Sequence, residues 1–352
     1  MKPSHRSSPY VKLTLLSIMH LVTDGLCSLL VFSRLYPENP QLSFITFILY
    51  NLLAFVSQAP VGSLIDRYNK PKTLLVISVC AVLLGYLTSG LCLLSVIFIG
   101  IGNSLFHVAG GKYVSEKSGN SIVDLGVFVS TGAVGLVLGQ RYYSALPLVY
   151  IFFALLIGSL VLLLISTDPE NKPYREEYGK DFDPRYAILA VVGVVFARSF
   201  VGKVISADFV TEDHVFLIIA IATALGKAIG GVASRIFGIP LTSTVSMLIA
   251  SICLTIGNGN PYTYILGIFA FNFSMPITLY FANILLKGKQ GFAFGTLAAV
   301  LAPAYFIAML FGYSIIMRIL VAAVCILSIV IINVIYKRIS YAKGPIISND
   351  SN

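Results

Sequence analysis

The stretch "GSLIDRYNKPKT", residues 62–73, concentrates charge in a chain that is almost pure hydrocarbon on both sides of it. Its seven positions from 66 to 72 contain four charged side chains: Asp66, Arg67, Lys70 and Lys72. The whole 352-residue chain is only 11% charged and 57% hydrophobic, with a mean hydropathy of +0.89. A soluble domain carries about 25% charged residues. The composition therefore indicates an integral membrane protein, with this stretch as a short loop at the membrane surface.

Twelve apolar stretches predict membrane-spanning helices. A spanning helix needs roughly 20 predominantly apolar residues, and membrane strands are disfavoured because the stretches are long and do not alternate. Helices also satisfy their own backbone polar groups in lipid. We expect an all-α polytopic membrane protein with spans at approximately 10–32, 41–61, 71–89, 91–113, 121–140, 146–166, 186–206, 213–233, 237–257, 261–286, 291–312 and 314–336.

Basic residues fall mainly in alternate loops. If twelve helices alternate in direction, the N-terminus, the 62–73 loop, the 167–185 segment and the C-terminal end share one side, and they carry most of the Lys and Arg. By the positive-inside rule that side is cytoplasmic, so we expect both termini in the cytoplasm, in a bacterial cytoplasmic membrane. The net charge of +9 is interpreted as this topology signal and not as a nucleic-acid-binding surface. The first apolar segment is too long for a signal peptide and is interpreted as an uncleaved span.

The longest polar stretch divides the chain into two halves. "STDPENKPYREEYGKDFDPRY", residues 166–186, combines Pro, Gly and mixed charges, which is typical of a linker. We predict a six-helix bundle over 1–166, a cytoplasmic linker over 167–185 and a second six-helix bundle over 186–352. A shift of 169 residues brings residues of one half onto the same type in the other: Gly62 onto Gly231, Asn103 onto Asn272, and Gly126 onto Gly295. Two parallel-related bundles with a site between them are a transporter plan.

The charged loop resembles the loop between the second and third helices of major facilitator superfamily transporters, which reads approximately G-x-L-x-D-R-x-G-R/K-x-K/R. Asn69 stands where that motif has a Gly, and Asn tolerates a left-handed backbone. The resemblance extends over the whole chain and implies two six-helix bundles around a midplane cavity. The matching residues are Gly62, Leu64, Asp66, Arg67, Lys70 and Lys72.

The same loop is predicted to act as a conformational latch. Gly62 lets neighbouring helices approach closely, and Asp66 is expected to accept hydrogen bonds from a helix N-terminus or an Arg. Such a cluster can hold one arrangement of the two halves and release in the other. The alternative is that Arg67, Lys70 and Lys72 only enforce orientation in the membrane. The two interpretations are compatible.

Three motifs in the first half resemble the fosmidomycin-resistance type of drug-efflux transporter. They are "HLVTD" in the first helix, "GIGNSLFH" in the fourth and "FVSTGAVGLVLG" in the fifth. The resemblance implies export of a small drug-like compound. The chain departs from the Gly-Pro that antiporters of the superfamily carry at the end of the fifth-helix motif, because Gly139 is followed by Gln140.

His20 and Asp24 are candidates for proton coupling. They lie one helical turn apart on one face, roughly 15 and 21 Å from the start of the first span at 1.5 Å per residue. A carboxylate at that depth is costly unless it faces water or a partner, and burial favours its neutral, protonated form. Asp24 would then carry the proton and His20 would share it. The alternative is a static buried pair that fixes helix packing.

Other polar residues inside the spans are candidates for substrate binding. His107 and Asn103 share a face of the fourth helix, where they either contact substrate or form hydrogen bonds between helices. Arg198 near mid-membrane suggests an anionic substrate group or a carboxylate partner such as Asp24. Three further basic residues are expected to extend to the nearest membrane surface: Lys203, Lys227 and Arg318.

Enzyme chemistry is not expected. The sequence contains no G-x-x-x-x-G-K-[ST] phosphate loop and no H-E-x-x-H metal motif, so we expect neither a metal nor a cofactor. We predict a monomeric secondary active transporter that works by alternating access, with protons, a small-molecule substrate and the lipid bilayer as its partners. The resemblance favours proton-coupled efflux of a drug-like or anionic compound. The alternatives are an importer or facilitator of a small nutrient, or a non-transporting membrane sensor with the same fold.

Overall fold

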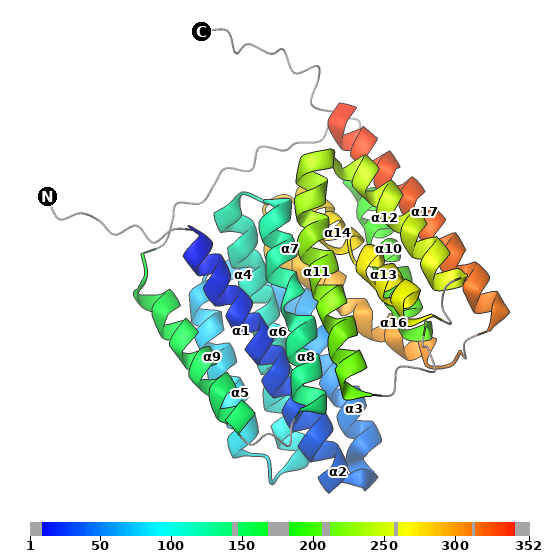
Figure 1. Ribbon diagram of the computed structural model, residues 1–352. Coiled ribbons are helices and arrows are strands. Elements are labelled where there is room, and N and C mark those ends of the chain that lie inside the picture. The colour runs from blue at the N-terminus through cyan, green and yellow to red at the C-terminus, as the bar shows by residue number, and fades with distance from the viewer. Residues whose placement is uncertain are drawn as a thin grey trace, which may run out of the picture.

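The computed structural model describes residues 9–142, 147–167, 183–205, 212–256, 260–311 and 314–341. Within these ranges every regular element is a helix, and the helices run side by side (Figure 1). Ten helices are long and apolar enough to cross a membrane, and two further apolar helices have 17 residues each. Together they give the twelve spans expected from the sequence, so the predicted fold class is confirmed.

The first six spans come from the first half of the chain. Spans 1, 2 and 5 are each assembled from consecutive helical pieces, because single π-helical turns or an interruption divide them. In chain order the pieces are α1 (Pro9–Leu30), η1 (Val31–Leu35) and α2 (Tyr36–Glu38); η2 (Pro40–Leu42), α3 (Ser43–Asn51), η3 (Leu52–Val56) and α4 (Gln58–Tyr68); α5 (Pro71–Leu87); α6 (Cys92–Ser118); α7 (Ile122–Ser130) and α8 (Gly132–Arg141); and α9 (Pro147–Ile165).

The other six spans come from the second half. Spans 10 and 11 are interrupted, whereas the others are single helices. The helices are α10 (Pro184–Val204), α11 (Asp213–Phe237), α12 (Ile239–Thr255), α13 (Pro261–Phe271) with α14 (Ser274–Leu285), α15 (Gln290–Ala299) with α16 (Leu301–Ala308), and α17 (Ile315–Tyr341).

Proline explains both interruptions in the second half. A proline inside a helix donates no backbone hydrogen bond and its ring clashes with the carbonyl four residues earlier. Pro276 follows the break between α13 and α14, and Pro303 follows the break between α15 and α16.

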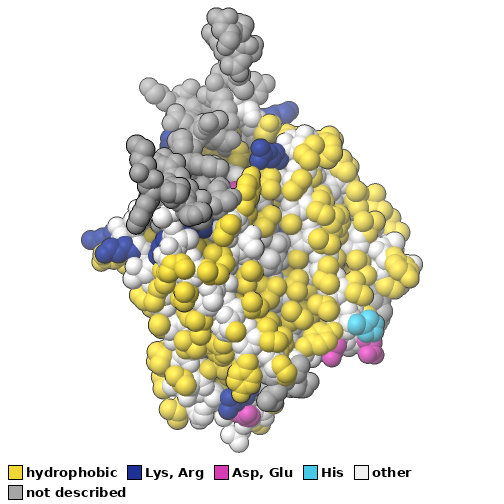
Figure 2. Space-filling view, turned by 60° about the vertical axis from the view of Figure 1, so that its left-hand side comes forward, with side chains coloured by type: hydrophobic (Ala, Val, Ile, Leu, Met, Phe, Trp, Pro, Cys, Tyr) yellow, Lys and Arg dark blue, Asp and Glu magenta, His cyan; other side chains and the backbone are white. Residues whose placement is uncertain are grey.

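The side of the molecule is apolar and its ends are charged. Figure 2 shows hydrophobic side chains over the side face, most of the visible Lys and Arg at one end, and Asp, Glu and His at the other. Large apolar side chains such as Leu87 (81% exposed) and Leu162 (52% exposed) point outward. Such a surface is stable in hydrocarbon and costly in water. The chain is a multi-pass integral membrane protein.

Two helix pairs join the halves across the middle of the molecule. We call the contact of α4 with α15 the first seam and the contact of α11 with α7 the second seam. In the first seam a Cβ added to Gly62 would strike the carbonyl of Gly291, and in the second a Cβ added to Gly231 would lie 2.6 Å from the carbonyl oxygen of Ile122. Glycine is therefore required in both seams for backbones to approach this closely.

The two seams follow the repeat read from the sequence. The shift of 169 residues takes Gly62 to Gly231 and Ile122 to Gly291, so the two contacts are equivalent. It also relates the contact of Gly295 with the Gln58 carbonyl to that of Gly126 with the Lys227 carbonyl. Residues 168–182 of the predicted linker lie outside the described residues, so the proposed domain boundary remains a prediction.

Candidate functional site

A cavity of about 570 Å³ lies between the two halves. Helices of spans 1, 2, 4 and 5 line one wall, and helices of spans 7, 8, 10 and 11 line the other. Most of the lining is apolar or aromatic, including Phe32, Phe47, Phe294 and Tyr305. A concave apolar site with a few polar groups is the usual form of a small-molecule site. The side chains of the lining that can carry a charge near pH 7 are His20, Asp24, His107, Arg198 and Lys227.

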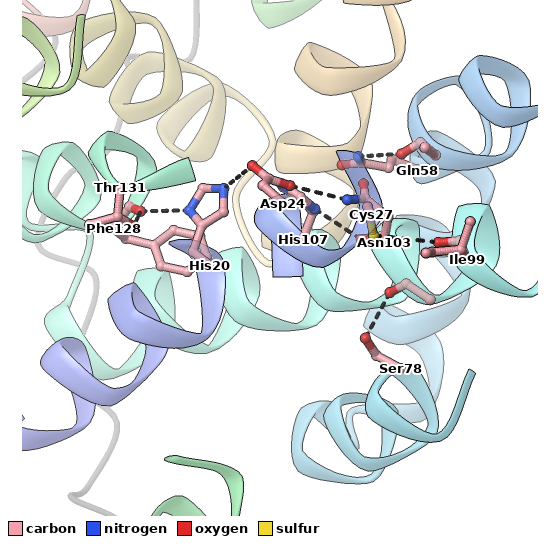
Figure 3. Close-up of polar contacts among 12 residues, drawn as sticks. His20, Asp24, Cys27, Gln58, Ser78, Ile99, Asn103, His107, Phe128 and Thr131 are labelled. Atoms are coloured by element: carbon pink, nitrogen blue, oxygen red, sulfur yellow. Dashed lines mark hydrogen bonds and ion pairs between the residues drawn. The ribbon is translucent and has the colours of Figure 1, made fainter. Parts of the chain in front are cut away.

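Three of these side chains form one cluster on the first wall, which we call the triad: His20, Asp24 and His107. His20 Nε2 lies 3.4 Å from Asp24 Oδ2, and His107 Nε2 lies 3.4 Å from Asp24 Oδ1. Figure 3 shows His20 of α1 between the Phe128 carbonyl and the Asp24 carboxylate. The three side chains are 6%, 16% and 12% exposed, in the order His20, Asp24, His107, and all line the cavity. The triad is thus largely desolvated yet reachable from the cavity.

The hydrogen bonds of the two imidazoles constrain where protons sit. His20 Nδ1 donates to the Phe128 carbonyl at 2.7 Å, and His107 Nδ1 donates to the Asn103 carbonyl at 2.9 Å. A carbonyl only accepts, so each Nδ1 carries a hydrogen. Each Nε2 therefore faces a carboxylate oxygen with its lone pair unless it also carries a proton. For either imidazole to form a hydrogen bond with Asp24, a proton must be added to its Nε2 or to the carboxylate oxygen that faces it. This arrangement suits a site that takes up and releases protons.

The surrounding helices hold the triad in place. Asn103 Nδ2 donates to Asp24 Oδ1 at 3.1 Å from behind the carboxylate. The His20 ring packs against Phe128 and Phe106 with centroids 4.9 and 5.8 Å away. A Cβ added to Gly132 would strike the Asp24 carboxylate and lie within contact distance of His20, so the start of α8 fits here only with glycine.

The donor atoms of the triad also lie close enough together to hold a bound cation. One donor atom from each side chain lies within 4.8 Å of the others. Imidazole nitrogens and a carboxylate oxygen accept protons and metal ions alike. The sequence predicted no metal, and protons are sufficient for the hydrogen-bonding pattern described above.

The opposite wall carries two cations and no carboxylate. Arg198 of α10 is 8% exposed, and its Nη1 is buried without a hydrogen-bond partner. Lys227 of α11 also lines the cavity. Among the described residues neither side chain has a carboxylate within ion-pairing distance, and the two cations are close enough to interact electrostatically. Two uncompensated charges in a largely desolvated cavity are costly, so this wall is suited to an anionic ligand.

The cavity is closed at the end that carries Asp66. Asp66 Oδ1 and Oδ2 accept the backbone N–H groups of Gly291 and Phe292 at 2.9 and 2.8 Å, at the N-terminus of α15. The buried Lys112 donates to Asp66 at 3.0 Å. This carboxylate satisfies orphan amides of a helix N-terminus in the other half, where the helix dipole favours a negative charge.

Buried amides add a second closure at the Asp66 end. Asn283 of α14 donates to Asn120 Oδ1 at 2.9 Å and to Ser115 Oγ at 3.0 Å. Asn120 in turn donates to the Tyr280 carbonyl at 3.2 Å. These bonds join α6 and its C-terminal turn to α14 of the other half. Each is lost when the halves separate.

The other predicted latch residues lie on the surface. Arg67 and Lys70 are exposed, and the Arg67 guanidinium lies 5.9 Å from the centroid of the Tyr68 ring. Lys72 is half-buried at the start of α5. Asn69 adopts φ of 50° and ψ of 44°, the left-handed turn expected for the residue that replaces glycine.

A looser contact lies at the opposite end of the cavity. Arg141 at the end of α8 is 3.7 Å from Asp213 at the start of α11 and stacks 3.9 Å from the centroid of Phe216. Both charged side chains are partly exposed, at 35% and 53%. This end is therefore joined by a solvated ion pair, whereas the Asp66 end is joined by buried hydrogen bonds.

The structure brings together most of the residues singled out from the sequence. His20, Asp24 and His107 form one cluster, Asn103 lies behind it without lining the cavity, and Arg198 faces it across the cavity without pairing to Asp24. The expectation for Lys227 was wrong, because its side chain lines the cavity and does not extend to the membrane surface.

Sequence reasoning also missed the role of Lys112 beneath Asp66. Two signals were available for Lys227. It adjoins Gly226 on a glycine-stepped helix face, and it is the repeat partner of Gln58, which lines the cavity as well.

Comparison with known proteins identifies the fold. No protein-family model matches the chain, and no curated protein sequence matches it. Solved structures do: an Escherichia coli fucose:proton symporter superposes with a TM-score of 0.68 at 12% identity, over 93% of this chain and 99% of that one. The human organic anion transporter MFSD10 gives 0.60 at 11%, over 93% and 99%. A bacterial homologue of the iron transporter ferroportin, in an outward-facing state, gives 0.58 at 14%, over 93% and 100%.

These similarities define the class of structure. The chain has the major facilitator fold, with twelve spans in two six-helix bundles, as predicted. At this level of identity the likeness extends to the fold, and the function is argued from the site.

Proposed function

We propose that this protein is a secondary active transporter that moves a small anionic solute by alternating access, coupled to protons. One observation carries the proposal: a single cavity between the halves has a proton-accepting triad on one wall and unpaired cations on the other. The similar structures agree in kind, because one is a fucose:proton symporter and another is an organic anion transporter.

Asp24 and His20 are the proposed proton-coupling residues, and the contacts of His107 add it to them. Asp24 is the carboxylate of the cavity lining, and two imidazoles approach its two oxygens. Arg198 and His107 are the proposed substrate contacts, because both line the cavity. Asn103 was predicted to bind substrate as well; its contact behind Asp24 supports a role in orienting the carboxylate instead.

The Asp66 cluster is the proposed latch. The buried bonds from Asp66 to α15 join opposite halves at one end only, so they must break when the cavity opens there. With both termini in the cytoplasm, as the distribution of basic residues favours, the Asp66 end is cytoplasmic and the cavity is shut towards the cytoplasm. We propose a monomer in a bacterial cytoplasmic membrane.

A non-transporting sensor with the same fold is the second candidate. It requires a dry interface between the halves and Arg198 in a permanent salt bridge. The cavity of about 570 Å³ and the unpartnered Nη1 of Arg198 argue against it. The resemblance in the first half implies efflux, and import is the alternative direction.

Growth of an efflux-deficient bacterium that expresses the protein tests the proposal. Cells are challenged with toxic organic anions, including fosmidomycin, beside cells that express Asp24→Asn at an equal level. A change in sensitivity that the substitution abolishes supports proton-coupled transport; raised resistance means efflux and raised sensitivity means uptake. Glu38→Gln is the matched control, because Glu38 is 55% exposed and pairs with Arg34 outside the cavity. Identical growth of all strains across the panel contradicts transport of this class of compound.

A further inference from the structure

We infer that the cavity binds an organic anion with two negative charges between Arg198 and Lys227, and that a proton on the triad strengthens this binding, so that proton and anion move together. The class of substrate and the sign of coupling go beyond the proposed function. The statement about movement rests on that function, whereas the statement about binding does not.

The charge of the lining supports a dianion. The ionisable lining residues contribute two cations, Arg198 and Lys227, and one carboxylate, Asp24. Asp24 is engaged by the two imidazoles and by Asn103 and forms no ion pair with either cation, so with neutral imidazoles the two cations and one carboxylate leave the lining a net charge of +1. A proton on the triad leaves the cavity with two uncompensated positive charges, which one dianion balances. Arginine and lysine together are the donors that oxyacid head groups select.

The rest of the lining suits an apolar body. Phe32, Phe47, Phe294 and Tyr305 line the same cavity, and its volume holds a ligand of drug-like size. A substrate with a doubly charged head and an aromatic or aliphatic body would place its head on the α10–α11 wall and its body against these rings.

The charges around the triad give the sign of coupling. The triad on α1 and α6 is the titrating group of its wall, and the neutral Asn103 lies behind it. The opposite wall carries Arg198 on α10 and Lys227 on α11. Lys227 is within electrostatic range of both Asp24 and His107. Cys27 and Tyr50 also face Asp24, as a thiol and a phenol that are neutral near pH 7. Two fixed cations therefore lie across the cavity from a titrating group whose protonation adds one more positive charge.

Protonation and anion binding then favour each other. For an assumed separation of ~10 Å and an effective dielectric constant of about 20, one added charge changes the affinity for one anionic charge about tenfold. Coupling is reciprocal, so a bound anion also makes the triad hold its proton more tightly. Exchange of a proton for the substrate requires the opposite sign, namely competition. This cavity is therefore built for symport, which imports the anion when the outside is more acidic.

Titration calorimetry on the purified full-length protein in detergent tests the inference without any flux. The probes are benzenesulfonate and meta-benzenedisulfonate, whose charges stay constant between about pH 5.5 and about pH 7.5, so that pH dependence reports on the protein. We expect the disulfonate to bind at least about tenfold more tightly than the monosulfonate and about tenfold more tightly at the lower pH. Buffers of different ionisation enthalpy should show proton uptake on binding.

Three variants separate this outcome from misfolding. Lys227→Gln should abolish the preference for the disulfonate, and Asp24→Asn should keep disulfonate binding while its pH dependence disappears. Arg34→Gln is the matched control, because Arg34 is 48% exposed, pairs with Glu38 and does not line the cavity, and it should bind like the wild type. Equal affinities for the two sulfonates, proton release on binding, or no binding of either one to the wild type would overturn the inference. Binding as expected with no flux in cells would instead contradict transport alone.

Discussion

The first and second seams share their packing and differ in their charges. Both place a glycine of one half against a backbone carbonyl of the other, at positions that the 169-residue shift makes equivalent. Yet Asp66 in the first seam caps α15, whereas the equivalent Arg235 in the second is exposed, and α7 receives its cap from its own Ser121. The same shift pairs the neutral Gln58 with the cationic Lys227, both in the cavity lining.

This difference separates architecture from chemistry. The glycine contacts are repeated because both bundles must approach closely for the fold to close. The charged groups are not repeated, since one latch is enough to bias an equilibrium between two arrangements and one wall is enough to hold an anion. The repeat thus accounts for the backbone contacts between the halves. The residues that depart from the repeat are those of the proposed latch and the proposed anion site.

The largest effect is expected from filling either seam. Gly62→Val and Gly231→Val each push a side chain into a backbone carbonyl, at a cost of about 1–3 kcal/mol or more, and should reduce transport to background in both cases. Flux of a substrate found in the growth assay is the measurement. Gly193→Val is the matched control, because nothing lies within 4 Å of a Cβ there. Loss of flux in only one of the two variants would show that the two seams are not equivalent.

The second effect concerns the charge of the first seam. Asp66→Asn should weaken two charge-assisted bonds, by about 1.5–3 kcal/mol together, and so open the Asp66 end about tenfold or more often. Hydrogen exchange of the Gly291 and Phe292 amides, read by mass spectrometry, should accelerate accordingly. Arg235→Gln, at the equivalent position, should leave exchange at Ile122 unchanged. Equal acceleration in both variants would break the contrast between the seams.

A smaller effect is expected when position 58 or position 227 of the cavity lining receives the residue of the other. Lys227→Gln puts at position 227 the residue found at the equivalent position 58. Because it removes one of two unpaired cations from the cavity, the thermal midpoint of the ligand-free protein should rise by about 2 °C. Gln58→Lys should lower the midpoint by a similar amount, because it adds a buried charge. Differential scanning fluorimetry in detergent measures both. A lower midpoint for Lys227→Gln would mean that the lysine is compensated.

The smallest effect is expected at the exposed end of the cavity. Arg141→Gln removes a partly solvated ion pair with Asp213 and a contact with Phe216, worth less than about 1 kcal/mol. Transport should change less than about fivefold, and the difference should shrink as salt is added. A loss as large as that of Asp66→Asn would show that this contact gates the cavity.

Much of the fold and part of the site followed from local patterns. Twelve apolar stretches predicted twelve spans, and the structure has ten long apolar helices and two shorter ones at these places. His20 and Asp24 were paired because they lie one helical turn apart, and they are 3.4 Å apart. Lys227 was misread because depth along a helix does not reveal which way a side chain points. His107 reaches Asp24 from another helix, a contact that no spacing within one helix predicts.

By itself the sequence determined what local chemistry decides: which segments are apolar enough to span a membrane, where proline interrupts them, and that Asn69 completes a left-handed turn. Only the tertiary structure decided which helix N-terminus Asp66 caps, that two imidazoles share one carboxylate, and that Arg198 and Lys227 face the cavity without an ion-pair partner among the described residues. The reason is physical. Hydrophobicity and backbone preference act over a few residues, whereas the partners of a buried charge are set by the packing of helices distant in the chain.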